Sequence, residues 1–188
     1  MKKHIYRSVP VIMICLMIFL PGNLDQTTKD ALKVQHLLRT IERSKPEATA
    51  PEQSAEVSEN ELNAFISYRL KQEKDPFVKG LKVGLLGEDQ LRGKLKLDAA
   101  HLKLDFLVGD AMELDFQGKV HSRNGAGRIE FSQFHLNGQV VDPSILGMVF
   151  KAAGKAYGSK MGGIDDWYEL PKGVNRLTVK KGKVILYY

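Results

Sequence analysis

The stretch LKVGLLGEDQLRGKLKLD, residues 81–98, decides the fold class of this chain. Large apolar residues alternate in it with lysine, arginine or glycine, at Leu81, Val83, Leu85, Leu91, Leu95 and Leu97. A period of two places these side chains on one face of a β-strand and the basic ones on the other face. The stretch therefore predicts strands with one dry and one wet face.

The same alternation continues towards the C-terminus, at Leu102, Leu104, Phe106, Met112, Leu114, Phe116, Val120, Ile129, Phe131, Phe134, Leu136 and Val140. It changes phase near Ala99-Ala100 and again at Ser132-Gln133, which predicts β-bulges or bends and hence strongly curved strands. The pair Asn124-Gly125 is typical of a hairpin turn. Residues 177–186 predict a closing hairpin whose turn contains Gly182.

Two helices are expected to accompany these strands. Ser58 and Glu61 have the spacing of a capping box, and apolar residues follow at helical spacing for three to four turns. Asp142-Pro143 predicts the start of a second amphipathic helix. The expected fold class is α+β: a long curved antiparallel β-sheet wrapped around amphipathic helices, in a single domain after an N-terminal signal or anchor.

A further helix is predicted over 28–43, where apolar residues recur every three or four positions. Residues 44–56, which hold two prolines and no large apolar residue, predict a linker. This helix is expected to pack on the domain or to lead out of the membrane, rather than to lie on a membrane surface, because its polar face mixes both charges. The expected organisation is 1–22 signal peptide or membrane anchor, 23–56 helix and polar linker, and 57–188 a lipid-binding-like domain.

The first 22 residues have the pattern of an export signal. Lys2, Lys3 and Arg7 precede an uncharged apolar run at 9–20. This run spans roughly 18 Å as a helix, less than the bilayer core of about 30 Å, which favours a cleaved signal. No small-residue cleavage site follows it, so an uncleaved anchor stays open. We expect an extracytoplasmic location in the periplasm, either secreted or anchored to the inner membrane.

Charge and cysteine content restrict the classes of function. Without residues 1–22, 25 Lys and Arg remain against 22 Asp and Glu, so the net charge falls from +6 to +3. This charge is spread along the chain, which argues against a nucleic-acid partner. Cys15 is the single cysteine, and it lies in the apolar run, so the domain is expected to have no disulfide.

No sequence motif indicates catalysis. The chain has no metal-binding histidine spacing, no nucleophile motif and no phosphate loop. His101, His121 and His135 are expected on solvent-exposed faces, and Asp165-Asp166 is interpreted as part of a loop rather than as an acid/base pair. We therefore expect a protein that is not an enzyme and that uses no cofactor and no metal.

The candidate ligand-binding residues are large apolar side chains on one face of the bent sheet and on two helices. They are Phe65, Ile66, Leu104, Phe106, Leu114, Phe116, Phe131, Phe134, Leu136, Leu146, Val149 and Phe150. They fill either an ordinary packed core or an apolar groove for acyl chains. The lysines Lys94, Lys96 and Lys103 on the wet face are candidates for contact with anionic head groups.

Four stretches, SENELN at 58–63, GEDQLRGKLKL at 87–97, VVDPSILGMVF at 140–150 and YELPKGVNRLTVKKGKVIL at 168–186, resemble the LmeA-type family of bacterial envelope proteins. That family closes with a pattern similar to L-P-x-G-V-x-L-x-x-V-x-V-x-x-G-x-L. The resemblance covers about residues 57–188, and LPKGV at 170–174 is its most specific part. It implies a tubular lipid-binding (TULIP-like) fold and a role in envelope lipid handling.

The expected function is that of an extracytoplasmic module that holds acyl chains in an apolar groove for lipid handling or transfer. A lipid or lipid-linked molecule is the expected partner, a membrane surface is a second candidate, and the pattern names no protein partner. The alternative is a structural or assembly protein of the envelope with a fully packed core.

Overall fold

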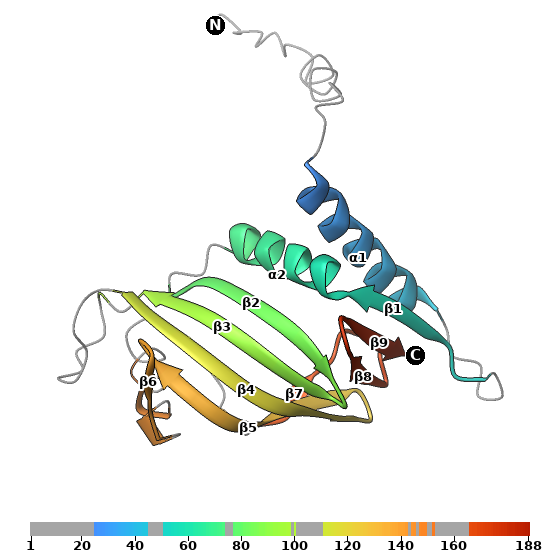
Figure 1. Ribbon diagram of the computed structural model, residues 1–188. Helices are drawn as coiled ribbons and strands as arrows, with labels where there is room; N and C mark the ends of the chain where they lie inside the picture. Colours follow the sequence, from blue (N-terminus) through green and yellow to red (C-terminus); the bar gives the residue numbers. More distant parts are fainter. Residues whose placement is uncertain are drawn as a thin grey trace, which may run out of the picture.

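The structure, a computed structural model, describes residues 25–44, 51–73, 77–98, 100, 111–142, 144–145, 147–149, 152 and 166–188. Its helices and strands are α1 (Gln26–Arg43), β1 (Ser54–Ser58), α2 (Glu59–Glu73), β2 (Val78–Gly87), β3 (Gln90–Asp98), β4 (Ala111–Arg123), β5 (Ala126–Leu136), β6 (Gln139–Val140), β7 (Tyr168–Glu169), β8 (Arg176–Lys180) and β9 (Lys183–Tyr187). The chain is α+β with a large curled antiparallel sheet, as the alternation predicts (Figure 1).

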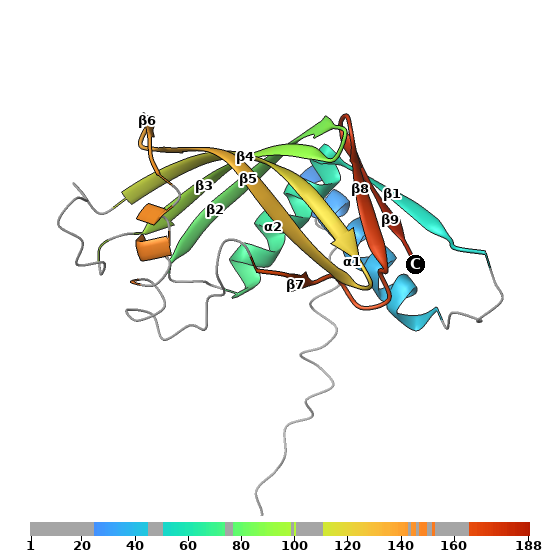
Figure 2. The same cartoon turned by 90° about the horizontal axis from the view of Figure 1, so that it is seen from below.

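The strands of the described residues form two antiparallel sheets. The larger has the order β2-β3-β4-β5-β6, with β7 beside β5, and the smaller has the order β1-β9-β8. Figure 2 shows the larger sheet curving over α2, with β1, β8 and β9 beside α1. The apolar face of the larger sheet is the concave one, so the helices cover the side that must leave water.

A β-bulge at Ser132 increases the curvature of the larger sheet. Gln117 of β4 pairs with Gln133, and the next residue, Gly118, pairs with Phe131, so Ser132 has no partner in this register. The extra residue confirms the phase change expected at Ser132-Gln133. The phase change expected near Ala99-Ala100 and the strand expected over 102–106 fall on or beside residues outside the described part of the chain.

Tight turns with positive φ join the strands. Asn124 and Gly125 have φ values of 49° and 74°, which confirms the predicted turn between β4 and β5. Glu88 and Asp89 have φ values of 53° and 60° in the turn between β2 and β3. Positive φ at both central residues is the type I′ geometry that suits hairpin twist, although glutamate rarely adopts it.

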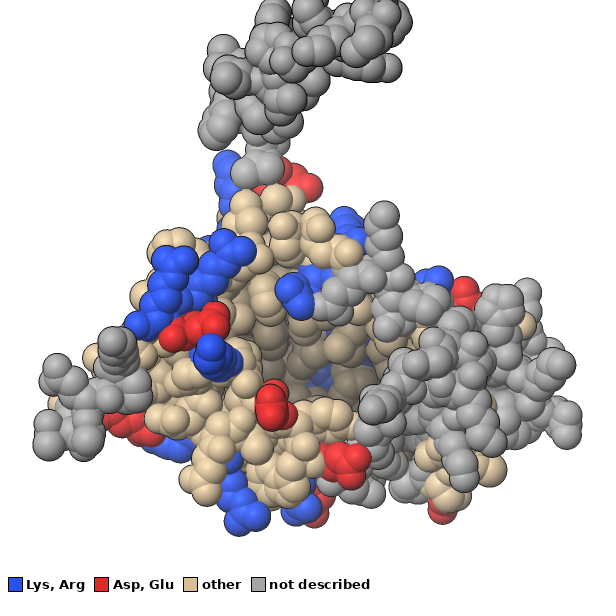
Figure 3. All heavy atoms as spheres, turned by 180° about the vertical axis from the view of Figure 1, so that it is seen from behind, with Lys and Arg blue, Asp and Glu red and all other residues tan. Residues whose placement is uncertain are grey.

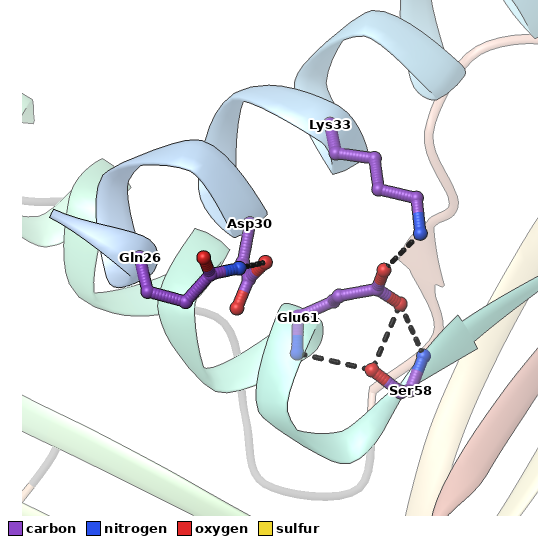
Figure 4. A network of polar contacts seen from close by, with 5 residues as sticks. All are labelled: Gln26, Asp30, Lys33, Ser58 and Glu61. Carbon is purple, nitrogen blue, oxygen red and sulfur yellow. Dashed lines mark hydrogen bonds and ion pairs between the residues drawn. The ribbon is translucent and has the colours of Figure 1, made fainter. Parts of the chain in front are cut away.

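The predicted capping box begins α2 (Figure 4). The Glu61 backbone N–H donates to Ser58 Oγ at 3.3 Å, and the Ser58 N–H donates to Glu61 Oε2 at 2.8 Å. The ammonium group of Lys33 on α1 pairs with the same Glu61 carboxylate. The box therefore starts one helix and attaches it to the other.

The helix predicted over 28–43 is confirmed as α1, and it packs on the domain. Ala31, Val34 and Ile41 are 0%, 4% and 1% exposed, and α1 contacts α2. Asp25 caps α1 by accepting a hydrogen bond from the Thr28 N–H at 2.7 Å. This helix is therefore part of the core.

The linker predicted over 44–56 is wrong at its C-terminal end. Ser54–Ser58 forms β1, which pairs with β9 and places Val57 opposite Val184. Five residues with one large apolar side chain carry little local strand signal, so a partner distant in sequence decides their conformation.

The structure describes the beginning of the helix that is expected after Asp142. Asp142 Oδ1 accepts a hydrogen bond from the Ser144 N–H at 2.8 Å, and residues 144–145 and 147–149 are helical. Apart from Ala152, which is also helical, the remainder of that helix lies outside the described residues, as does the signal expected at 1–22. None of the described helices is both long and apolar enough to cross a bilayer.

Candidate functional site: an apolar cavity under the curled sheet

A cavity of about 720 Å³ lies between the concave face of the larger sheet, the two helices and the smaller sheet. Apolar side chains form most of its wall, namely Val34, Leu38, Val57, Leu62, Phe65, Leu81, Val83, Leu85, Leu91, Leu95, Leu114, Phe116, Val120, Ile129, Phe131, Phe134, Leu170, Pro171, Leu177, Val179, Val184 and Leu186. Figure 3 shows a hollow walled mainly by uncharged residues. The volume lies within the range of about 300–1,000 Å³ that small-molecule sites occupy.

Several candidate residues from the sequence meet in this wall, and others do not. Phe65, Leu114, Phe116, Phe131 and Phe134 line the cavity.

The remaining candidates lie elsewhere. Ile66 packs against the hydrophobic cluster formed by the helices and the smaller sheet, away from the lining. Leu136 and Val149 are 8% and 1% exposed in a second cluster, where they pack as core residues. Leu104, Phe106, Leu146 and Phe150 lie outside the described residues.

The cavity lies between two packed clusters. One contains the ends of β3, β4 and β5 together with Phe77 and Val149, and the other contains α1, the smaller sheet and the opposite end of β2. Leu81 and Phe116 pack against both clusters. The apolar face of the sheet thus extends through both clusters, and members of both line the cavity.

Glycines on the concave face allow aromatic rings to lie close to the sheet. A Cβ atom at Gly93 would lie 2.1 Å from Cζ of Phe116, its partner on β4. A Cβ atom at Gly118 would lie 2.7 Å from Cγ2 of Ile129. The Phe116 ring then meets Phe131 edge to face, with 5.4 Å between ring centroids. Large side chains here lie along the cavity wall, because the residues beneath them have no side chain.

Side chains of α2 hold the helix at the edge of the larger sheet. The Asn63 side chain accepts from the Val83 N–H and donates to the Val83 carbonyl, both at 2.7 Å. Glu59 Oε2 accepts from the Leu85 N–H at 2.8 Å. β2 is the edge strand, so these bonds satisfy backbone groups that an open edge leaves unpaired. They also hold α2 against β2, and both elements contribute to the wall of the cavity.

The LPKGV segment, residues 170–174, follows β7 and turns against α1. Leu170 and Pro171 line the cavity, and Val174 is 3% exposed in the adjacent cluster. Gly173 has a φ of 89°, and a Cβ atom there would lie 2.9 Å from the Ile41 carbonyl oxygen. The glycine therefore permits both the turn and its close contact with α1.

Polar groups are confined to one part of the wall, at Arg128, Tyr168 and Glu169. Tyr168 is 50% exposed, and burial of part of its side chain together with the charge of Asp166 raises the pKa of its hydroxyl. The cavity thus has an apolar interior and a small polar border. This distribution complements an amphiphile, which has an apolar chain and a polar head.

No family model, curated protein or solved structure matches the chain. Within the described residues, no three His, Cys, Asp or Glu side chains lie close enough together to hold a metal ion. The side chains that line the cavity offer apolar contact and a polar edge.

Sequence reasoning missed part of the wall. The alternation at Leu81, Val83, Leu85, Leu91 and Leu95 placed these residues on the dry face, so that signal was sufficient to include them. For α1, β8 and β9 the local patterns predicted a helix and a hairpin, but no local signal indicated that they line the cavity. Their contact with the cavity depends on pairing between β1 and β9, which joins residues more than a hundred positions apart.

Proposed function

We propose that this protein is an extracytoplasmic lipid-binding module that holds acyl chains in the apolar cavity. The observation that carries the proposal is a cavity of about 720 Å³ whose wall is almost entirely aliphatic and aromatic. Burial of an acyl chain there gains about 0.8 kcal/mol per methylene. Holding a lipid requires no catalytic group, so the proposed role is transfer or retention and not turnover.

Two features of the sequence support the same proposal. Residues 1–22 have the pattern of an export signal or anchor, which would bring the domain next to a membrane. The resemblance of residues 57–188 to LmeA-type envelope proteins implies a lipid-handling fold. A structural protein with a fully packed core is the rival, and a cavity of this size favours lipid binding over it.

The first test is native mass spectrometry with lipid extraction on the full chain, purified from the envelope of an expression host in an uncharged detergent. A co-purifying lipid at defined stoichiometry is expected. An empty protein that also takes up no fluorescent fatty acid would overturn the proposal and favour the packed-core rival.

A cavity-filling variant sharpens this test. Leu62→Trp puts a large ring into the wall from α2, whereas Leu70→Trp changes a half-buried residue of the same helix that does not line the cavity. Leu62→Trp is expected to reduce uptake of the fatty acid at least fivefold, and Leu70→Trp is expected to retain it. Equal uptake by both variants would place the probe outside the cavity.

A further inference from the structure

A second cavity, of about 570 Å³, lies where β4 ends beside β8. It shares Val120, Arg128 and Leu177 with the apolar cavity, so the two are neighbours. Its wall carries more charge than that of the apolar cavity, because it includes Lys119, Arg123 and Arg128.

The strand register explains why these cations gather on one face. Arg128 of β5 pairs with His121 of β4, and Arg123 pairs with Ala126. Lys119, His121 and Arg123 are two residues apart, so they point to the same face as Arg128. The basic side chains at the adjoining ends of β4 and β5 therefore face the second cavity.

Three of these cations form no salt bridge with any residue that the structure describes. In the part of the chain that the structure describes, no salt bridge involves Lys119, Arg123 or Arg128. Two neighbouring side chains have acidic partners, because Arg176 pairs with Glu52 at 2.6 Å and the His121 imidazole contacts Glu130 at 2.7 Å.

Lys94, one of the three wet-face lysines expected to meet head groups, has acidic partners, because it contacts Glu113 at 2.6 Å and Asp115 at 3.3 Å. Among the residues that line the second cavity, Asp89 carries a carboxylate, and its Oδ1 accepts from the Val179 N–H at 2.8 Å. The second cavity is thus a place where positive charge exceeds negative charge.

Trp167 orders two of these guanidinium groups. Cζ of Arg123 lies 4.8 Å from the centroid of its ring, and Cζ of Arg128 lies 5.3 Å from it. Contact with an aromatic ring restrains a guanidinium without cancelling its charge, and it leaves the N–H groups at the edge free to donate. The pair is therefore organised in advance for an anion.

Two buried polar atoms in the second cavity's wall lack a protein partner. They are Arg128 Nε and Thr178 Oγ1, and within the described residues they are the buried side-chain nitrogen and oxygen atoms for which no protein group forms a hydrogen bond. Both residues line this cavity. Such atoms are costly while they are unsatisfied, and a ligand oxygen that reaches either of them would satisfy it.

We propose that this cavity binds a phosphate group, held by Arg128 and Arg123 with Lys119 and Thr178 beside them. Guanidinium groups match the oxygens of phosphate by donating in pairs, and the cavity supplies two such groups together with a hydroxyl. The phosphate belongs either to a lipid whose chain occupies the neighbouring apolar cavity or to a small soluble phosphate ester. The site does not depend on the proposed lipid function, because its cations bind phosphate from either source.

Trp167 is the single tryptophan of the chain, so its fluorescence reports on this site directly. The full chain in uncharged detergent is titrated with inorganic phosphate, with dioctanoyl phosphatidic acid and with dioctanoylglycerol, each at matched ionic strength. A saturable change with phosphate indicates a soluble source. A change with phosphatidic acid and none with phosphate indicates a lipid head group.

Matched variants separate binding from general charge effects. Arg128→Gln is expected to weaken the saturable response at least tenfold, and Arg123→Gln and Thr178→Val to weaken it by smaller factors. Arg39→Gln, which changes an exposed arginine of α1 that does not line this cavity, is expected to change it less than twofold. Arg123→Gln and Thr178→Val still test the site if Arg128→Gln fails to fold, as judged by circular dichroism.

The proposal is overturned where phosphate and phosphatidic acid produce no more change than sodium chloride, or where the response is the same in all four variants. Failure of the lipid function is recognised separately. In that case the protein takes up no fluorescent fatty acid, and dioctanoylglycerol, which has no phosphate, produces no response.

Discussion

The ring of Phe116 on β4 lies against the backbone of Gly93 on β3, so closely that a Cβ atom there would be 2.1 Å from Cζ of the ring. The two residues are register partners on the concave face of the sheet. One has the largest kind of side chain on that face and the other has none. This relationship keeps the ring along the wall and away from the middle of the cavity.

Gly93→Ala is therefore expected to displace the Phe116 ring and to lower the free energy of unfolding by about 1–3 kcal/mol, the usual cost of overpacking. The measurement is chemical denaturation, together with fatty-acid uptake. Gly80→Ala is the control, because its Cβ atom would meet its nearest neighbour at 3.9 Å. Phe116→Leu in the Gly93→Ala background is expected to restore part of the stability, and an additive loss would contradict the contact.

Glu61 makes the joint between the helices sensitive to acid. Hydrogen bonding to Lys33, together with the Ser58 bonds, lowers the pKa of Glu61 below its ordinary value of 4.5, although partial burial opposes this shift. A carboxylate with a lowered pKa stabilises the fold above about pH 4.5, and this stabilisation is lost as the pH falls through the folded-state value.

Glu61→Gln is expected to lower stability at pH 7 by about 1 kcal/mol and to flatten the decline below pH 4.5. Urea denaturation from pH 7 to pH 3 measures both effects. Glu42→Gln is the control, because Glu42 pairs with Lys172 at the exposed surface. A Glu61→Gln variant with an unchanged acid profile would show that other carboxylates control the acid response.

Asn63→Ala is expected to lower the free energy of unfolding by about 1–3 kcal/mol, because it leaves the Val83 N–H and carbonyl without partners at the sheet edge. Hydrogen exchange of the Val83 amide is expected to accelerate with it. Asn60→Ala changes an exposed residue of the same helix and is expected to do neither. Equal effects of both variants would indicate loss of helix stability in general.

Ser122 joins the two sheets, since its hydroxyl donates to the Leu177 carbonyl at 2.7 Å and accepts from the Leu177 N–H at 2.9 Å. Ser122→Ala is expected to reduce the melting temperature and to lower stability by about 1–3 kcal/mol. Ser132→Ala, at an exposed bulge with a long 3.4 Å contact, is the comparison and is expected to be near neutral. A neutral Ser122→Ala variant would mean that packing alone closes this junction.

Local patterns were enough to predict much of the fold. The capping box at Ser58 and Glu61, the turn at Asn124-Gly125 and the bulge at Ser132 depend on neighbouring residues and backbone sterics, and each was found where it was expected. β1 was missed because its conformation depends on pairing with β9. The turn at Glu88-Asp89 was not predicted because glutamate rarely adopts a positive φ, and a bond from the distant Val179 N–H to Asp89 supports this turn.

For the candidate site, alternation identified the dry face and several of its residues. It did not distinguish Phe134, which lines the cavity, from Leu136, which does not, although both belong to the same core cluster. Both side chains leave water, so both give the same periodic signal.

The sequence by itself determined the α+β class, the curvature of the larger sheet and the polarity of its faces, because period, turns and bulges are set by residues close in the chain. Only the tertiary structure decided that the dry face surrounds a cavity, and that Arg123, Arg128, Trp167 and Thr178 share one space. Cavities and charge clusters depend on which elements meet. That choice is made by the summed packing of distant segments, which no local pattern records.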